Sequence, residues 1–346
     1  MKILLFTDLH MCPRASIINK LGTKYSARLE NCIESVNWLE NLAKERGCKY
    51  IINLGDFFDK PDLSGETITA SKDIQWSDIM HYSIVGNHDA STSDLMFNSV
   101  NSFRADRHGI IAEPQLLLLE DCDILFLPYV VECNRKPLDQ YFLDCNLKPI
   151  VTGKPRVILS HNDIKGLQLG PVTSKTGFSI EEIEANCDLF LNGHLHNGQA
   201  ISSKIINLGN LTGKDFGEDA SKHSHNIAIL DTKTLKLELI ENPHAFNFYK
   251  IQIDTESDFE QLYRLKPKAV ISVKCDSALV DRVKQVIAEQ SNIIESRIII
   301  TKKYEDPTEV AEIDLSVDHL ARFIECCRAN IEASALLEEE LAEICK

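Results

Sequence analysis

The chain has 346 residues, of which 44% are hydrophobic and 26% charged, so it is long enough for one large domain and a smaller one with buried cores. No apolar run approaches the roughly 18 residues that a membrane span needs, and Asp8 interrupts the apolar start before a signal-peptide core is complete, so we expect a soluble cytoplasmic protein without a membrane partner. The net charge of −15 is unfavourable for a free-standing nucleic-acid binder, since phosphate binding usually leaves a basic footprint.

The first predicted elements form a β-α-β unit. Residues 2–7 and 50–54 are short apolar runs of the kind that strands buried on both faces show. Residues 26–46 between them carry apolar side chains at helical spacing, and Gly47 supplies the stop. Both strands lead directly into polar clusters, Asp8-Leu9-His10 and Gly55-Asp56.

Three more buried strands are predicted, and each again precedes a polar cluster. Residues 82–85 precede Gly86-Asn87-His88-Asp89, residues 157–159 precede Ser160-His161, and residues 189–191 precede Gly193-His194-Leu195-His196. A Ser-x-x-Glu capping box at residues 179–182 opens a short helix before the last of these strands. Because ligands of α/β sheets gather at the carboxyl ends of the strands, we expect the five clusters to meet at one edge.

The pattern after His196 changes to a run of strand signals. Residues 204–208, 226–230 and 235–240 predict a second sheet layer, and residues 116–119 and 124–127 predict a further hairpin. We therefore expect a mixed α/β (α+β) fold over residues 1–245, built as a two-sheet β-sandwich flanked by helices.

The remaining residues predict two smaller parts. Residues 246–304 read as a small α/β unit without a catalytic-looking cluster. Residues 305–346 hold 12 acidic side chains against Arg322, Arg328 and Lys346, and from Val317 onward apolar residues recur at helical spacing. This acidic amphipathic helical segment either packs back on its own domain or binds a partner that has a basic surface.

The five clusters together supply the ligands of a two-metal site. Imidazoles, carboxylates and an amide oxygen form the mixed set that suits Mn²⁺, Fe or Zn²⁺. Two such cations a few ångström apart promote hydrolysis at phosphorus. The seven candidate ligands are Asp8, His10, Asp56, Asn87, His161, His194 and His196.

Spacing gives these candidates a first assignment. The site needs a bridging carboxylate, for which we select Asp56, and Asp8 and His10 lie two apart on one loop and so can share one metal. His194 and His196 have the same spacing and can each reach a different metal. The remaining pair, Asn87 and His161, would complete the second ion.

His88 is predicted to stay uncoordinated and to act as the general acid, since a departing alkoxide needs a proton and an imidazole titrates near the working pH. Asp89 is expected to orient the His88 ring, and Asp59 to do the same for a ligand. Each cluster alone is more often an ordinary turn, and only their joint occurrence points to a metal site. The other histidines are expected in the core or at the surface: His81, His108, His223, His225, His244 and His319.

The residues resemble the calcineurin-like metallophosphoesterase superfamily, whose Asp-x-His, Gly-Asp, Gly-Asn-His-Asp/Glu, His and Gly-His-x-His pattern they match over roughly the first 210 positions. Within it, Gly55-Asp56-Phe57-Phe58-Asp59, Asp89 and the small domain with its amphipathic tail resemble SbcD-type, meiotic-recombination-eleven-like DNA repair nuclease subunits. Phage recombination endonuclease subunits belong to the same group.

The resemblance implies a site and a domain plan. One metal would be bound by Asp8, His10, Asp56 and His196, the other by Asp56, Asn87, His161 and His194, and His88 falls where the family has its leaving-group acid. Residues 246–304 would be a capping domain. Residues 305–346 would bind the coiled-coil base of an SbcC-type ATPase.

The implied function is that of a Mn²⁺-dependent DNA exonuclease and endonuclease subunit that hydrolyses phosphodiester bonds at DNA ends, within an SbcCD-like recombination and repair complex. Two alternatives are kept. An enzyme of the same superfamily would hydrolyse a small phosphodiester or a phosphoprotein, which the negative charge favours, and a non-catalytic scaffold would retain only the fold. The sequence leaves open whether the chain forms a homodimer.

Overall fold

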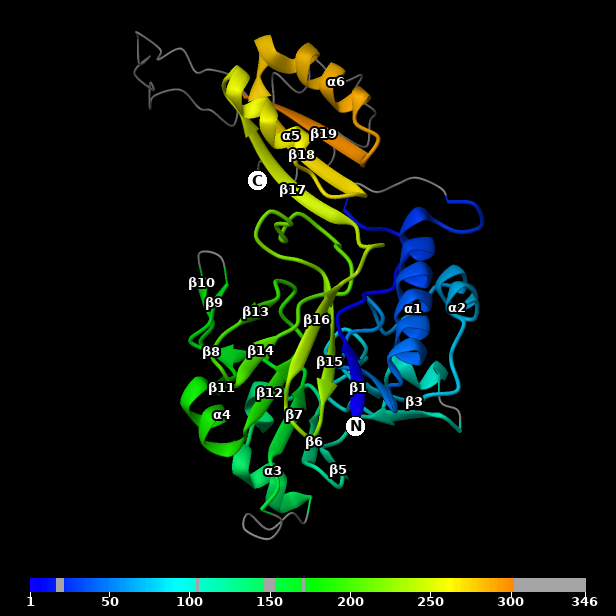
Figure 1. Cartoon of the computed structure of the whole chain (residues 1–346), viewed down its shortest axis with the longest axis vertical. Helices are drawn as coiled ribbons and strands as arrows, with labels where there is room; N and C mark the ends of the chain where they lie inside the picture. Colours follow the sequence, from blue (N-terminus) through cyan, green and yellow to red (C-terminus); the bar gives the residue numbers. More distant parts are fainter. Residues whose placement is uncertain (17–21, 104–105, 146–152, 170–171, 302–346) are drawn as a thin grey trace, which may run out of the picture. The chain divides into compact units, whose positions relative to one another are not determined.

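The computed structural model of the chain describes residues 1–16, 22–103, 106–145, 153–169 and 172–301 (Figure 1). These residues form two six-stranded sheets, a three-stranded sheet and two short two-stranded ladders. All of them belong to one unit, Met1–Thr301. The predicted acidic segment, residues 305–346, lies outside the described residues, as does His319.

The first six-stranded sheet grows from the predicted β-α-β unit. Its order is β16 (Leu237–Glu241), β15 (Asn226–Asp231), β1 (Lys2–Phe6), β2 (Tyr50–Asn53), β3 (Met80–Ile84) and β4 (His108–Ile111). The pairs from β1 to β4 are parallel, whereas β15 and β16 join antiparallel. The parallel pairing brings the carboxyl ends of β1, β2 and β3 to one edge.

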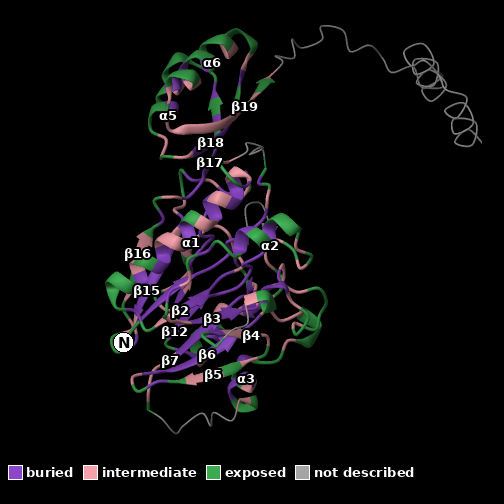
Figure 2. Cartoon of the chain, turned by 90° about the vertical axis from the view of Figure 1, so that its right-hand side faces the viewer, coloured by how far each residue is buried: buried purple, intermediate pink, exposed green. Residues whose placement is uncertain are grey.

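Helix α1 (Ala27–Arg46) covers one face of this sheet. The hydroxyl of Ser26 accepts a hydrogen bond from the backbone N–H of Leu29 and caps the helix start. Gly47 ends the helix in the left-handed conformation, at φ 68°, which glycine adopts without steric cost. The buried stripe of α1, which includes Leu29 and Val36, packs into the core against this sheet, and Figure 2 shows it facing the buried strands.

The second six-stranded sheet stacks on the other face of the first. Its order is β13 (Gln199–Ala200), β14 (Ile205–Asn207), β12 (Leu189–Asn192), β7 (Arg156–Ser160), β6 (Asp123–Leu127) and β5 (Gln115–Leu118). Ile3, Leu5 and Ile52 of the first sheet share one buried core with Phe126 and Leu159 of the second. The predicted β-sandwich flanked by helices is therefore confirmed.

Helices also cover the outer face of the second sheet. The side chains of α3 (Leu138–Asp144) and α4 (Ile180–Asn186) form a further core with Leu125, Ile158 and Phe190. The Ser179 hydroxyl accepts a hydrogen bond from the N–H of Glu182, as the capping box predicts for the start of α4.

One prediction about the strands after His196 is wrong. Only the first of the three, β14, belongs to the second sheet, where it pairs with β12. The other two, β15 and β16, extend the first sheet beside β1. Strands of both sheets are rich in similar apolar residues, so the local pattern does not encode which distant strand is the partner.

A third sheet follows, with strands β17 (Asn247–Ile253), β18 (Ala269–Asp276) and β19 (Ile293–Thr301), all parallel. It has its own core, in which Ile251 and Val273 pack against Val283 of α6 (Val280–Glu289). The domain boundaries at residues 245 and 304 stay predictions. The shorter elements are α2 (Gly65–Ser71), α5 (Glu260–Tyr263), β8 (Ile164–Lys165), β9 (Gln168–Leu169), β10 (Val172–Thr173) and β11 (Phe178–Ser179), with 3-10 turns at Ser99–Phe103, Glu132–Asn134, Glu256–Phe259 and Ser277–Leu279.

Candidate metal centre

The seven predicted ligands lie on the loops that leave β1, β2, β3, β7 and β12 at their carboxyl ends. Backbone hydrogen bonds bind these loops to one another: Asp8 N–H donates to the Gly55 carbonyl and His10 N–H to the Asp56 carbonyl, both at 3.0 Å. The second sheet is fixed to the first by the N–H of His194, which donates to Asp8 Oδ2 at 2.9 Å. The fold thus gathers side chains that are up to 188 positions apart.

Backbone strain is concentrated at these ligands. Seven described residues other than glycine have a positive φ, and four of them are candidate ligands: Asp8 (51°), His10 (46°), Asp56 (50°) and His194 (77°). Such conformations each cost on the order of 1–3 kcal/mol and tend to occur where function requires them. Close packing adds a further constraint, because a Cβ at Gly55 would collide with the His161 ring and one at Gly86 with the Asp56 carboxylate.

A first group of ligand atoms is formed by Asp8, His10 and His196, whose donor atoms lie within 4.8 Å of one another. The Nε2 atoms of His10 and His196 are 2.9 Å apart. Asp8 Oδ1 lies 3.8 Å and Asp56 Oδ2 lies 3.7 Å from His10 Nε2. Three side chains and one oxygen of Asp56 therefore face the same small space.

A second group is formed by Asp56, His161 and His194, again with donor atoms within 4.8 Å. Asp56 Oδ2 lies 3.1 Å from His161 Nε2. The amide oxygen of Asn87 lies 3.3 Å from His161 Nε2 and 3.0 Å from His194 Nδ1. Because the same oxygen of Asp56 faces both groups, its position suits a bridging carboxylate.

The four histidines of these groups use their other ring nitrogen to contact a fixed oxygen. His161 Nδ1 donates to the Leu54 carbonyl at 2.9 Å. His196 Nδ1 lies 3.1 Å from Glu218 Oε1, His194 Nε2 lies 3.1 Å from Asp163 Oδ1, and His10 Nδ1 lies 3.4 Å from Asp59 Oδ1. Metal-binding histidines almost always have such an outer contact, which fixes the tautomer and the ring orientation.

The buried charges of the site also fit divalent cations. Asp8 Oδ1 is buried and accepts no hydrogen bond from any described residue. Burial by itself would lower the pKa of His10 and of His161, but the surrounding carboxylates raise both to about 9. The imidazoles thus take up protons where the site lacks another cation, and metal ions compete for the same lone pairs.

His88 lies beside the two groups, and its backbone N–H donates to Asp56 Oδ1 at 2.9 Å. Its Nδ1 donates to the backbone carbonyl of Asp59 at 2.9 Å, which leaves Nε2 as the nitrogen that can exchange a proton with a substrate. Burial lowers the pKa of His88, and the Asp56 charge partly opposes this effect. With Asp56 and His10, His88 also forms a third group of potential ligand atoms.

The carboxylate of Asp89 does not hold the His88 ring as predicted. It is fully buried, and its two oxygens accept the backbone N–H groups of Gly86 and Phe58, at 3.1 and 3.0 Å. Burial, followed by repulsion from Asp56, raises the pKa of Asp89 to about 7. Asp89 therefore binds the Asn87-His88 loop to the Asp56 loop, and acts on His88 only through the backbone.

Four residues that contact the candidate ligands or their loops were not predicted from the sequence. Glu218 and Asp163 contact His196 and His194, as described above. Lys214 pairs with the carboxylate of Asp59, and the buried Arg28 donates to the carbonyls of Leu9 and Gly213 at 2.7 and 2.9 Å. Only Asp163, two residues after His161, had a recognisable sequence signal.

Five of the histidines without a predicted role lie among the described residues. His81 contacts Glu40 at 2.7 Å and His108 contacts Ser83 at 2.9 Å, both in the protein interior. The other three also have polar contacts outside the metal groups: His223, His225 and His244. None of the five belongs to a described group of potential metal ligands.

Comparisons with known proteins identify a family for the chain. The family model described as calcineurin-like phosphoesterase matches residues 1–198, and no curated protein matches the chain. Similar solved structures include TT1561 of Thermus thermophilus (12% identity, TM-score 0.40, covering 69% of this chain and 98% of that one). A dimetal phosphatase from Danio rerio (14%, 0.39, 66% and 91%) and the calcineurin-like phosphoesterase YfkN from Bacillus subtilis (10%, 0.37, 70% and 88%) are also similar.

Among the described residues, no helix is long and apolar enough to cross a membrane.

The matched region covers more than half of the chain and contains all seven candidate ligands. The family binds two divalent metal ions in a dinuclear site and hydrolyses phosphoesters. The chain belongs to the calcineurin-like phosphoesterase family.

Proposed function

We propose that this phosphoesterase is a Mn²⁺-dependent DNA nuclease subunit of the SbcD type, which acts on phosphodiester bonds at DNA ends together with a coiled-coil ATPase. The observation that carries the hydrolytic part of the proposal is the position of Asp56, whose Oδ2 lies 3.7 Å from His10 Nε2 and 3.1 Å from His161 Nε2. A shared carboxylate oxygen between two groups of ligands is what a dinuclear hydrolytic site requires.

The seven ligands divide into two sets. Asp8, His10, Asp56 and His196 would hold one cation, and Asp56, Asn87, His161 and His194 the other. When bound, the two cations would supply Lewis acidity toward the phosphoryl oxygens and lower the pKa of a water at the site. The mixture of nitrogen and oxygen donors is compatible with Mn²⁺.

His88 would supply the proton for the leaving group. The Asp59 carbonyl holds His88 Nδ1–H, so Nε2 is the atom that delivers a proton to the departing oxygen. The N–H of His88 also binds Asp56 Oδ1, which fixes the ring beside the shared carboxylate. Lys214, which pairs with Asp59, adds a positive charge near His10.

DNA as the substrate is supported by the resemblance in sequence rather than by the metal geometry. The segment Gly55-Asp56-Phe57-Phe58-Asp59 and Asp89 match the nuclease subunits, and a separate three-stranded sheet follows the sandwich. The acidic segment 305–346 would bind the ATPase and place the site beside a basic partner.

The net charge of −15 favours a second candidate, a phosphoesterase that acts on a small phosphodiester or a phosphoprotein. The two functions are separated by assaying the full chain with Mn²⁺ on linear double-stranded DNA and on bis-p-nitrophenyl phosphate, with and without an SbcC-type ATPase. Hydrolysis of both substrates supports the nuclease. Hydrolysis of the small ester alone, even with the ATPase present, would contradict the nuclease proposal and favour the second candidate.

A further inference from the structure

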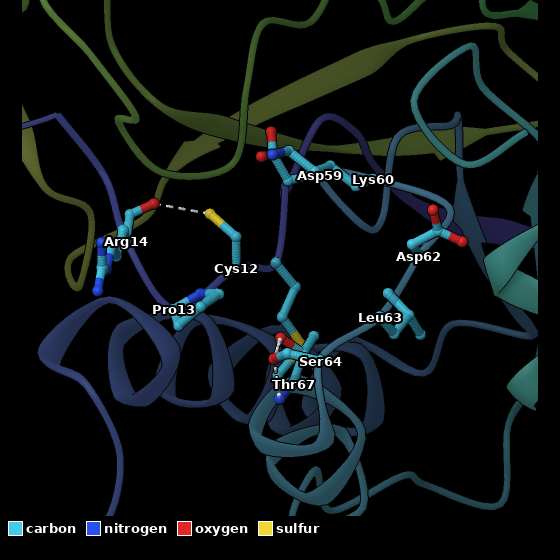
Figure 3. A pocket seen from close by; sticks show the side chains of 10 residues that line it. Cys12, Pro13, Arg14, Asp59, Lys60, Asp62, Leu63, Ser64 and Thr67 are labelled. Carbon is cyan, nitrogen blue, oxygen red and sulfur yellow. Dashed lines mark hydrogen bonds between the residues drawn. The ribbon is translucent and has the colours of Figure 1, made fainter. Parts of the chain in front are cut away.

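The structure contains a pocket of about 280 Å³, and Figure 3 shows the side chains that line it. Two chain segments form its walls, the loop that follows His10 and the stretch from Asp59 to the start of α2. Its lining residues are Met11, Cys12, Pro13, Arg14, Asp59, Lys60, Asp62, Leu63, Ser64 and Thr67.

The pocket adjoins the catalytic residues directly. Asp59 belongs to its wall and also contacts His10 Nδ1 at 3.4 Å, while the Asp59 carbonyl holds His88. Met11 follows His10 in the chain and is itself part of the wall. A molecule in the pocket is therefore next to the position where a phosphodiester would be cleaved.

The walls are preformed. The N–H of Met11 donates to the Phe57 carbonyl at 2.8 Å, and Met11 forms a β-bridge with Phe58. On the other wall, the Ser64 hydroxyl accepts the N–H of Thr67 at 3.1 Å and caps α2. Because hydrogen bonds hold both walls in place, the pocket requires little reorganisation to receive a ligand.

The lining combines apolar surface with free positive charge. Pro13 and Leu63, both partly exposed, offer apolar contact to a flat ring, and the buried Met11 backs the pocket from the core. Arg14 and Lys60 are exposed, and neither pairs with a carboxylate among the described residues. On a chain of net charge −15, these two cations outnumber the one lining carboxylate without an ion pair among the described residues, Asp62. Together with the apolar surface they complement a ligand that joins a planar base to a phosphate.

We infer that this pocket binds one unpaired nucleotide of the DNA strand being cut, with the base against Pro13 and Leu63 and the adjoining phosphate near Arg14 and Lys60. This inference rests on the proposed nuclease function. It adds a contact with the base, which the metal site does not make. Asp62, which makes no ion pair with a described residue, is an acceptor for an amino group on the base edge.

The size of the pocket decides between single and paired bases. Ligand pockets for drug-sized molecules measure roughly 300–1,000 Å³, and at 280 Å³ this pocket lies just below that range, which favours a single base over a base pair. The nucleotide next to the scissile bond must then leave its partner strand, as bases do when an enzyme reads them in a pocket. Frayed or single-stranded ends are the substrates that meet this condition at least cost.

The test uses the full chain with Mn²⁺ and three substrates: a single-stranded deoxyoligonucleotide, a fully abasic oligonucleotide of the same length, and bis-p-nitrophenyl phosphate. Leu63→Trp fills the pocket, and the double variant Arg14→Ala/Lys60→Ala removes its charges from exposed positions where folding is not at risk. Lys236→Ala, an exposed lysine on the far hairpin, is the matched control. Melting temperatures confirm that each variant is folded.

We expect the KM of the wild type for the abasic strand to exceed its KM for the ordinary strand by about 10-fold, the size of one lost base contact. Leu63→Trp should raise the KM for the ordinary strand to the value that the wild type shows for the abasic strand. This variant should therefore have the same KM for both strands. Its KM for the small ester should change about 10-fold less than its KM for the ordinary strand. The double variant should raise KM for both strands, and Lys236→Ala should match the wild type.

Two results would overturn the inference, and they are distinguishable. If the wild type cuts the abasic strand as well as the ordinary one, or Leu63→Trp retains the wild-type KM, the pocket does not bind a base although the chain is a nuclease. If the wild type hydrolyses the small ester and neither strand, the proposed function fails and the inference fails with it.

Discussion

Glu218 gives the most specific prediction about how the protein supports its metal site. Only 4% of its side chain is exposed, and Oε1 lies 3.1 Å from His196 Nδ1. The same carboxylate accepts Asn210 Nδ2 at 2.7 Å and the backbone N–H of Lys214 at 3.0 Å. All its partners are donors, and one of them is the outer nitrogen of a candidate ligand.

The substitution Glu218→Gln keeps the shape of the side chain and removes its charge. An amide that keeps its oxygen toward His196 and Asn210 points its NH₂ group at the Lys214 N–H, which then has only the longer contact of 3.2 Å to that oxygen. The NH₂ group faces another donor and is left unsatisfied, at a cost of about 1–3 kcal/mol. His196 then loses a charged acceptor. Loss of such an outer contact typically weakens metal binding about 10- to 100-fold, or about 1.4–2.7 kcal/mol.

The matched variant is Asp163→Asn, which acts on His194 in the same way. Because the Asp163 side chain is 24% exposed, water can replace part of the contact and the effect should be nearer the lower limit. Calorimetric titration with Mn²⁺ should show one weakened and one intact site in each variant. The site weakened by Glu218→Gln should be the one left intact by Asp163→Asn.

Two outcomes of this comparison would contradict the roles assigned to the two carboxylates. If both variants bind two Mn²⁺ ions with wild-type affinities, the two carboxylates do not orient metal ligands. If Glu218→Gln weakens both sites equally, His196 and His194 do not serve different cations. The double variant should weaken both sites additively, since the two carboxylates contact different histidines.

Two further predictions concern chemistry and stability. His88→Ala should retain both metals and slow DNA hydrolysis about 10²-fold or more, while bis-p-nitrophenyl phosphate, whose leaving group departs without a proton, should be affected far less; equal losses on both substrates would refute the general-acid role. Burial, with a smaller contribution from His81, lowers the pKa of His108 to about 3, so below pH 6.5 the unfolded chain binds a proton at this residue and the folded chain does not. The free energy of unfolding should therefore decrease by about 2 kcal/mol between pH 7 and pH 5 from this residue alone. In denaturant titrations His108→Gln should lose about 2 kcal/mol less over that range, and an identical loss in both proteins would contradict the explanation.

The sandwich and the meeting of the seven ligands could be predicted because both follow from local patterns. Each ligand comes directly after a short apolar run, and the carboxyl ends of parallel strands lie at one edge. The partners of β15 and β16 could not be predicted, since pairing between distant strands depends on the packing of the whole sheet.

The support for the ligands was harder to predict. Glu218 lies 22 positions from His196, in a loop without a motif, and only the folded chain brings them to 3.1 Å. Asp89 was expected to orient the His88 ring because the two are adjacent in sequence. In the structure the Asp89 oxygens instead accept hydrogen bonds from two backbone N–H groups. A buried carboxylate without hydrogen-bond donors would be costly, and here the backbone supplies the donors.

The two-metal site depends on Asp56 serving both groups of ligands, and measuring the metal content of an Asp56 variant tests this role. The wild-type chain and Asp56→Asn, each dialysed after exposure to excess Mn²⁺, are compared by elemental analysis, with circular dichroism to confirm that both are folded. We expect two Mn²⁺ ions per wild-type chain and the loss of both in Asp56→Asn. Two tightly held ions in Asp56→Asn, or none in the wild type, would contradict this expectation.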